Sequence, residues 1–446
     1  MIIAYCMNTR TATTLAAMLV STAATLAIAP LEGWWSGELM KMPLVVHLGN
    51  DSGCLYSPAQ TADSIPLSRL DMTGDTLHFE VGAIGLSYTG VFSDGKISGT
   101  LHQGSDYRLT FFPASAADAS LYRPQTPRPP FFYSVENLTF PSGDLTLAGT
   151  LTTPYQRPFG AIVLVSGSGA QTRDEEIAGH KPFAVIADEL TRSGWAVLRY
   201  DDRGAGGSER GKPTDTTLDF AQDAMAAVST LRKRFPGLPV GIAGHSEGGT
   251  IAMINAAQYP DSFDFIISMA GMAVDGSELM IRQNEMMLEL AGAPEDPALH
   301  ADLEATFRIV ASDMPEAEAA EKIDSIMSRT LSDPAMRAGS VRGLLTPWYR
   351  RFIRLTPSVY LDRIKCPMLA INGTWDVQVE AAPNLKAISD RVATAKTVEL
   401  AGLNHLFQEA PSRSQSFNYA AISQTISPKA LKAITDFLTD YLRSRK

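Results

Sequence analysis

The pentapeptide at residues 244–248, Gly-His-Ser-Glu-Gly, contains residue types at a spacing that could do covalent chemistry. It follows the apolar run "LPVGIA" and precedes a helical pattern, which is the strand–turn–helix setting of a G-x-S-x-G nucleophile elbow. The small flanking residues allow a sharp turn that holds the central serine in a strained backbone conformation. The pattern therefore predicts that Ser246 is the nucleophile of a hydrolase.

A serine nucleophile needs a histidine base, which in this setting follows it in the sequence. Only His300 and His405 follow Ser246. His300 lies in "PEDPALHADLE", a helical pattern that indicates a solvated position. His405 lies in "VELAGLNHLFQEA", on a turn after an apolar strand, so we predict that it is the base. The alternative is that His405 is a hydrogen-bonded structural histidine.

The base needs a carboxylate to orient it, and three aspartates were compared for this role. Asp376 in "MLAINGTWDVQV" comes just after an apolar strand, so its carboxylate can reach a histidine on the next loop. Asp362 precedes that strand and Asp390 lies in a helical pattern, so Asp376 is preferred. His245 is expected to point away from the reaction, because it is the immediate neighbour of Ser246 in a sharp turn.

The glycine-rich stretch "AIVLVSGSGAQTRDEE", residues 161–176, could bind a phosphate or could stabilise an oxyanion. A dinucleotide-binding turn would continue as G-x-G-x-x-G, but Thr172 occupies the third glycine position and acidic residues follow it. The oxyanion interpretation is therefore preferred. It assigns the amide of Ser168, or less favourably of Gly167, together with that of Glu247, to the oxyanion hole.

Two kinds of sequence pattern predict the elements that position these residues. Residues 30–113 contain short alternating stretches separated by turns, which predict a small all-β domain. A Pro- and Ala-rich linker is expected at residues 114–131. From residue 132 to 446, apolar runs alternate with helical patterns, which predict a mostly parallel sheet with helices on both faces. Residues 276–355 lack a strand pattern and are expected to form a helical cap.

The N-terminus and the composition narrow the location and the partners. Residues 1–29 resemble a secretory signal peptide, so we expect an exported, periplasmic or secreted protein without a membrane anchor once the leader is removed. The alternative is an uncleaved N-terminal helix. The net charge of −10 and the lack of a basic block argue against a nucleic-acid partner. The three cysteines and the histidines show no metal-binding spacing, so neither a metal nor a cofactor is expected.

The stretches "SGSGAQTRDE", "VLRYDDRGAGGS", "GHSEGG", "AINGTWDVQV" and "LNHLFQ" together resemble the exported bacterial, serine-aminopeptidase-like branch of the α/β-hydrolase superfamily. The resemblance covers residues 132–446, and the N-terminal stretch resembles the β-rich domain that often precedes such enzymes. It implies the α/β-hydrolase fold and a Ser246–Asp376–His405 triad. Ala170 departs from the proline that commonly follows SGSG, which leaves the amide donors in place.

These features lead to one expected activity and two alternatives. We expect a serine carboxylesterase that hydrolyses short-chain acyl esters through an acyl-enzyme intermediate. The first alternative is a serine aminopeptidase, and the second is a catalytically inactive binding protein on the same fold. The expected partner is a small acyl ester, and the sequence does not predict an oligomeric state.

Overall fold

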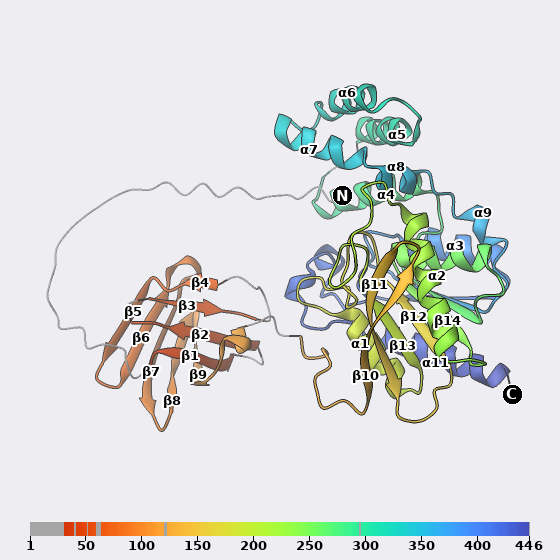
Figure 1. Cartoon of the computed structure of the whole chain (residues 1–446). Coiled ribbons are helices and arrows are strands. Elements are labelled where there is room, and N and C mark those ends of the chain that lie inside the picture. The colour runs from red at the N-terminus through yellow and green to blue at the C-terminus, as the bar shows by residue number, and fades with distance from the viewer. Residues whose placement is uncertain are drawn as a thin grey trace. The chain divides into compact units, whose positions relative to one another are not determined.

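The computed structural model describes residues 31–39, 42–50, 52–58, 64–119, 123–293 and 296–445 (Figure 1). The described chain forms two compact units. The β unit comprises residues 31–124 and 420–423, and the α/β unit comprises residues 125–419 and 424–445. The division at residue 124 falls inside the segment predicted as a linker. The predicted leader, residues 1–29, lies outside the described residues.

The β unit is one antiparallel sheet in the order β4-β3-β2-β1-β9-β8-β7-β6-β5. Its core contains the stacked rings of Phe79 and Tyr88, with Phe111 edge-on to Tyr88. The alternation of buried and exposed residues along its strands is that of a half-buried sheet. The strands are β1 (Gly33–Leu39), β2 (Met42–Leu48), β3 (Gly53–Tyr56), β4 (Ser64–Pro66), β5 (Arg69–Thr73), β6 (Thr76–Val81), β7 (Leu86–Ser93), β8 (Lys96–Gln103) and β9 (Ser105–Pro113).

The α/β unit contains an eight-stranded sheet in the order β10-β11-β13-β12-β14-β15-β16-β17. The strands from β12 onward are parallel, and every residue of β12 to β16 is buried, as a sheet covered on both faces requires. The strands are β10 (Tyr133–Ser142), β11 (Leu145–Pro154), β12 (Ala161–Val165), β13 (Ala196–Tyr200), β14 (Val240–His245), β15 (Phe265–Met269), β16 (Met368–Gly373) and β17 (Ala395–Leu400).

Helices cover both faces of this sheet and bury one apolar cluster on each. One cluster joins the sheet to α2 (Thr217–Arg234), α3 (Glu247–Gln258), α9 (Ser358–Leu361) and α10 (Ala381–Arg391). The other joins it to α1 (Pro182–Arg192) and α11 (Pro428–Ser444). The parallel order places the carboxyl ends of all six strands at one edge, where the loops that follow them can meet.

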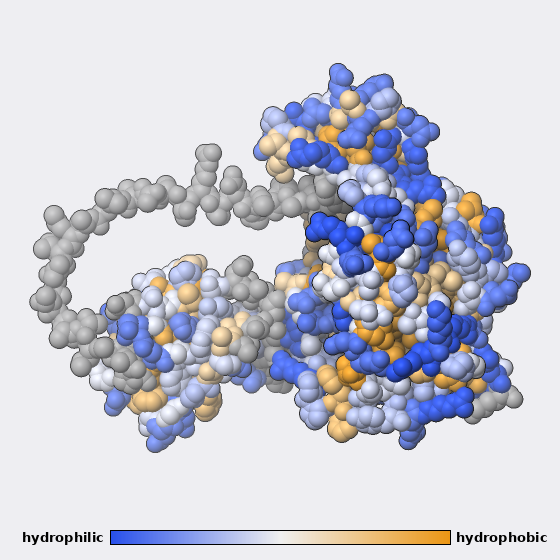
Figure 2. All heavy atoms as spheres, viewed as in Figure 1, coloured by the Kyte–Doolittle hydropathy of each residue, from blue (hydrophilic) through white to orange (hydrophobic). Residues whose placement is uncertain are grey.

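A helical cap is inserted between β15 and β16 and has an apolar core of its own. Its outer surface in the region of α5 to α7 is mostly hydrophilic, as the upper part of Figure 2 shows. Each of α5, α7 and α8 begins with proline after a capping Asp or Thr. The cap helices are α4 (Gly276–Leu290), α5 (Pro297–Ala311), α6 (Glu316–Met327), α7 (Pro334–Leu344) and α8 (Pro347–Ile353).

These units confirm the predicted fold class, an α/β-hydrolase fold preceded by a β-rich region. The antiparallel hairpin of β10 and β11 was not predicted. It extends the sheet at one edge and pairs with β13 through β11. Over the described stretches, no helix is long and apolar enough to cross a membrane.

Candidate active site

Ser246 lies at the tip of a sharp turn between β14 and α3. Its backbone has φ 53° and ψ −120°, a region that side-chain-bearing residues seldom adopt. The turn needs its flanking glycines. A Cβ at Gly244 would lie 2.0 Å from the carbonyl oxygen of Gly248, and one at Gly248 would lie 2.1 Å from that of Val165. The sequence thus produces the strained elbow that its G-x-S-x-G pattern predicts.

His405 and Asp376 form a buried pair at the carboxyl ends of β16 and β17. The Nδ1 atom of His405 lies 2.7 Å from Oδ2 of Asp376. The other carboxylate oxygen accepts hydrogen bonds from the amides of Gln378 and Val379, at 2.8 and 2.9 Å. Since the carboxylate is held on both sides, it fixes the ring so that Nδ1 carries the proton and Nε2 is the basic nitrogen.

The loop of His405 lies directly against the elbow. His245, the residue before Ser246, has its Nε2 atom 2.9 Å from the main-chain oxygen of His405. The two imidazole rings are 4.7 Å apart between centroids. The structure therefore places the His405–Asp376 pair beside the turn of Ser246, although these residues are far apart in the sequence.

The loop after β12 also lies against the elbow. A Cβ built at Gly167 would lie 3.1 Å from Cβ of Ser246. The amide of Gly167 donates to Oε1 of Glu175 at 2.7 Å, so it is already engaged. Ser168 is exposed, and the amide of Glu247 is the first of helix α3, a position without an acceptor inside the helix. The amides of Ser168 and Glu247 are thus better placed than that of Gly167 to receive an anion.

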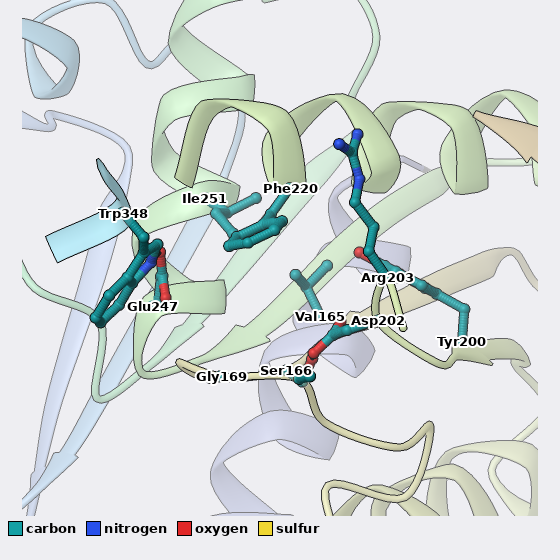
Figure 3. A pocket seen from close by; sticks show the side chains of 12 residues that line it. Val165, Ser166, Gly169, Tyr200, Asp202, Arg203, Phe220, Glu247, Ile251 and Trp348 are labelled. Carbon is teal, nitrogen blue, oxygen red and sulfur yellow. Dashed lines mark hydrogen bonds between the residues drawn. The ribbon is translucent and has the colours of Figure 1, made fainter. Parts of the chain in front are cut away.

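A pocket of about 180 Å³ opens beside this loop (Figure 3). Three charged residues line it, the buried Glu247 and the partly buried Asp202 and Arg203, and most of the remaining wall is apolar. The indole nitrogen of Trp348 on α8 donates to Oε1 of Glu247 at 2.9 Å, so the cap forms one wall of the pocket. The lining residues are Val165, Ser166, Gly167, Gly169, Ala170, Tyr200, Asp202, Arg203, Phe220, Glu247, Ile251 and Trp348.

Burial dominates the electrostatics of this pocket. It raises the pKa of Asp202 to about 8, although Ser166 and the amide of Gln171 donate to its carboxylate. Burial also raises the pKa of Glu247, against the hydrogen bonds from Thr217, Trp348 and Ser168. The pocket wall therefore disfavours negative charge.

The other sequence candidates lie apart from Ser246 and have partners of their own. His300 on α5 is exposed and bonds to Glu285. Asp362 pairs with Arg391 at 3.0 Å, and Asp390 pairs with Lys386 at 2.8 Å. Within the described parts of the chain, no group of three or more His, Cys, Asp or Glu side chains could hold a metal ion.

Sequence reasoning missed Glu175, which contacts both the glycine-rich loop and the elbow. Its Oε1 atom lies 2.9 Å from Nδ1 of His245, and its backbone has a φ of 51°. The acidic run at residues 174–176 gives no indication of which carboxylate turns inward. A histidine directly before the nucleophile was the available signal, because a buried imidazole in a tight turn needs an acceptor.

Comparison with known proteins places this site in a family. The profile of the family described as serine aminopeptidase, S33, matches residues 157–409, more than half of the chain. Esterase EstD of Thermotoga maritima is 28% identical over 294 residues, which are 64% of this chain and 64% of EstD. Human monoglyceride lipase is 32% identical over 130 residues, which are 28% of this chain and 40% of the lipase.

The chain thus spans less than two thirds of the length of these two relatives. Among solved structures, Est1E of Butyrivibrio proteoclasticus with bound ferulic acid aligns with a TM-score of 0.43 at 17% identity, over 69% of this chain and 99% of Est1E. The profile match and the topology of the sheet agree with each other. The chain belongs to the serine aminopeptidase S33 family of α/β hydrolases.

Proposed function

We propose that this protein is a serine carboxylesterase that hydrolyses short-chain acyl esters. Ser246 is the nucleophile, His405 the general base and Asp376 the carboxylate that orients it. The amides of Ser168 and Glu247 form the oxyanion hole. The observation that carries the proposal is the strained Ser246 turn, which lies against the loop of a buried His405–Asp376 pair.

The reaction follows from this arrangement in two halves. His405 takes the proton from the Ser246 hydroxyl as its oxygen attacks the acyl carbonyl, and then gives that proton to the departing alcohol. Water, deprotonated by the same imidazole, next cleaves the acyl-enzyme and releases the acid. Each amide that stabilises the oxyanion contributes about 3 kcal/mol to the transition state.

The cap argues for an ester rather than a peptide substrate. An aminopeptidase needs an available carboxylate to bind the free ammonium group of its substrate. Glu285 bonds to His300 and Arg282, whereas Glu289 bonds to Arg282 and Arg413. Since both carboxylates already neutralise cations, they do not provide that anchor. Asp296 caps helix α5 through the amide of Ala298, and Glu295 lies outside the described residues.

The pocket supports an uncharged and short acyl group. Its volume of about 180 Å³ is below the range of roughly 300–1,000 Å³ typical of sites for drug-sized ligands. Phe220, Ile251 and Trp348 give it apolar walls. The similarity to EstD, an esterase by name, supports an ester as the substrate.

The first experiment compares the purified wild-type enzyme with Ser246→Ala. We expect the variant to lose roughly a millionfold in kcat on a p-nitrophenyl ester, as removal of a triad nucleophile does elsewhere. A fluorophosphonate probe should label the wild type and not the variant. Failure of the folded wild type to react with the probe would instead favour an inactive binding protein.

A second experiment separates esterase from peptidase. Because an amide leaves only after its nitrogen is protonated, we expect kcat/KM for short acyl esters to exceed that for matched arylamides by about a hundredfold, or about 2.7 kcal/mol in barrier. Comparable rates on the two substrates, or loss of arylamide activity in Glu285→Gln, would favour the aminopeptidase.

We also propose that residues 1–29 direct export. N-terminal sequencing of the protein isolated from its native host would test this. Removal of the leader is the expected result, and an intact N-terminus in a membrane fraction would favour the uncleaved anchor.

A further inference from the structure

We propose that Glu175 and a doubly protonated His245 form a positioning pair that aligns the catalytic groups. The pair does not touch the reacting atoms. It acts through the glycine-rich loop, the elbow and the loop of His405. The inference rests on the proposed function, but its charge state can be measured without any activity.

The protonation of His245 follows from what its two ring nitrogens face. Nδ1 lies 2.9 Å from a carboxylate oxygen of Glu175, and Nε2 lies 2.9 Å from the carbonyl oxygen of His405. A carbonyl oxygen can only accept, and Oε1 of Glu175 already accepts from the Gly167 amide. When Glu175 is ionised, both ring nitrogens must therefore donate, which requires the imidazolium form.

Burial makes this pair an electrostatic unit. The exposed fraction is 5% for His245 and 1% for Glu175. The second carboxylate oxygen, Oε2 of Glu175, is buried and has no hydrogen-bond partner in the described chain. A carboxylate held in this way is costly unless a cation compensates it, and the imidazolium is the group in contact with it.

The pair connects three segments whose relative positions the reaction depends on. Glu175 accepts from the amide of Gly167, one residue before the proposed oxyanion donor Ser168. His245 directly precedes the nucleophile, and it donates to the main chain of the proposed base. A change at Glu175 is therefore transmitted to all three, and a misplacement of about 1 Å can lower a rate by as much as a hundredfold.

The pKa of His245 is shifted in a defined direction. Burial lowers its pKa, but the charge and hydrogen bond of Glu175, the carbonyl of His405 and the charge of Asp376 outweigh that effect, so the pKa is raised overall. Two further titratable groups lie near the pair or interact with its charge. The ring of His405 has its centroid 4.7 Å from that of His245, and the charge of Glu175 acts on Asp202. The contribution of His245 to the pairing is therefore present at and below its ordinary pKa and is lost as the pH rises through its raised pKa.

The test variant is Glu175→Gln, which keeps an acceptor oxygen for the Gly167 amide and removes the charge. The matched control is Glu176→Gln, which makes the same change at the neighbouring exposed carboxylate, 3.4 Å from Nζ of Lys181. We expect Glu175→Gln to lower kcat about tenfold with KM within about twofold. The alkaline fall in its kcat profile should move to lower pH. Glu176→Gln should match the wild type in both respects.

Histidine-selective ¹⁵N NMR of the wild type tests the charge state directly. The signals of His245 are identified among those of the seven histidines because they disappear in His245→Gln and shift in Glu175→Gln. At pH 7.5, about one unit above the ordinary pKa of histidine, we expect both nitrogens of His245 to carry protons. A nitrogen of His245 without a proton at that pH would overturn the proposal, as would a Glu175→Gln variant with an unchanged kcat profile. Absence of wild-type esterase activity would refute only the proposed function.

Discussion

Two buried histidine–carboxylate pairs lie side by side in this protein, and the second ring nitrogen distinguishes them. His405 bonds to Asp376 at 2.7 Å and His245 bonds to Glu175 at 2.9 Å, each through Nδ1. The Nε2 atom of His245 is engaged with a carbonyl oxygen, whereas Nε2 of His405 makes no hydrogen bond within the described residues. In the proposed reaction, an imidazole–carboxylate pair thus serves as a base or as a positioning pair according to what the second ring nitrogen faces.

The largest difference should appear when each histidine is replaced. We expect His405→Ala to lower kcat by roughly a millionfold, because the nucleophile then lacks its base. His245→Gln should lower kcat about tenfold, because only the alignment of the groups is disturbed. Steady-state kinetics on one short-chain ester measures both variants.

Circular dichroism of both variants is the control for folding. Equal losses in two folded variants would contradict the division of roles and would place His245 among the reacting groups.

Replacement of Asp376 should lower kcat more than replacement of Glu175. The difference should be smaller than that between the two histidine variants. We expect Asp376→Asn to lower kcat by about ten-thousandfold, because an asparagine can hold the imidazole in the wrong tautomer. Glu175→Gln should cost only about tenfold. Pre-steady-state acylation rates of the two variants give the comparison, and an Asp376→Asn enzyme within a hundredfold of the wild type would make another acid the orienting group.

Much of the fold and of the His405–Asp376 pair could be predicted because the signals are local. The residues of β12 and β14 form continuous apolar runs, and each run ends in a glycine-rich turn. Asp376 directly follows a strand, and His405 follows the next strand of the sheet. Strand order alone then brings both side chains to one edge.

The role of Glu175 could not be predicted because its partners are distant in sequence. It bonds to His245, 70 residues away, and it turns inward only through a positive φ that glutamate rarely adopts. The adjacent Asp174 bonds to Arg199 instead. Nothing in the local run of acids distinguishes these two orientations. The β10–β11 hairpin was missed for a related reason, because its pairing with β13 is a long-range contact.

The charge of the positioning pair should also appear in the stability of the protein. Since the pKa of His245 is raised in the fold, the pair stabilises the native state below that pKa and loses its contribution as the pH rises through it. We expect Glu175→Gln to lower the free energy of unfolding by about 1–3 kcal/mol at pH 7 and by progressively less at alkaline pH. Urea unfolding at several pH values measures this, with Glu176→Gln as the control. A destabilisation that stays constant with pH would contradict an ion pair.

The smallest expected effect concerns the buried carboxyl group of Glu247. It accepts hydrogen bonds from a hydroxyl and an indole, whereas the carboxylates of Asp376 and Glu175 pair with an imidazole. Oε1 of Glu247 accepts from the hydroxyl of Thr217 at 2.6 Å and from the indole of Trp348 at 2.9 Å. Trp348→Phe keeps a ring stacked on Phe352 and removes the indole donor. Since Glu247 keeps the bond from Thr217, the loss is that of one hydrogen bond, about 1 kcal/mol.

We therefore expect Trp348→Phe to lower kcat/KM for short-chain esters about fivefold, in keeping with the loss of that bond. The smaller ring also widens the pocket, so the preference for short over longer acyl chains should weaken. The control is Tyr349→Phe, which alters the next residue of α8, one that does not line the pocket. An acyl-chain series measured on both variants decides the point. An unchanged chain-length profile in Trp348→Phe would mean that the acyl group binds elsewhere, and that Glu247 holds the cap in place without shaping the substrate.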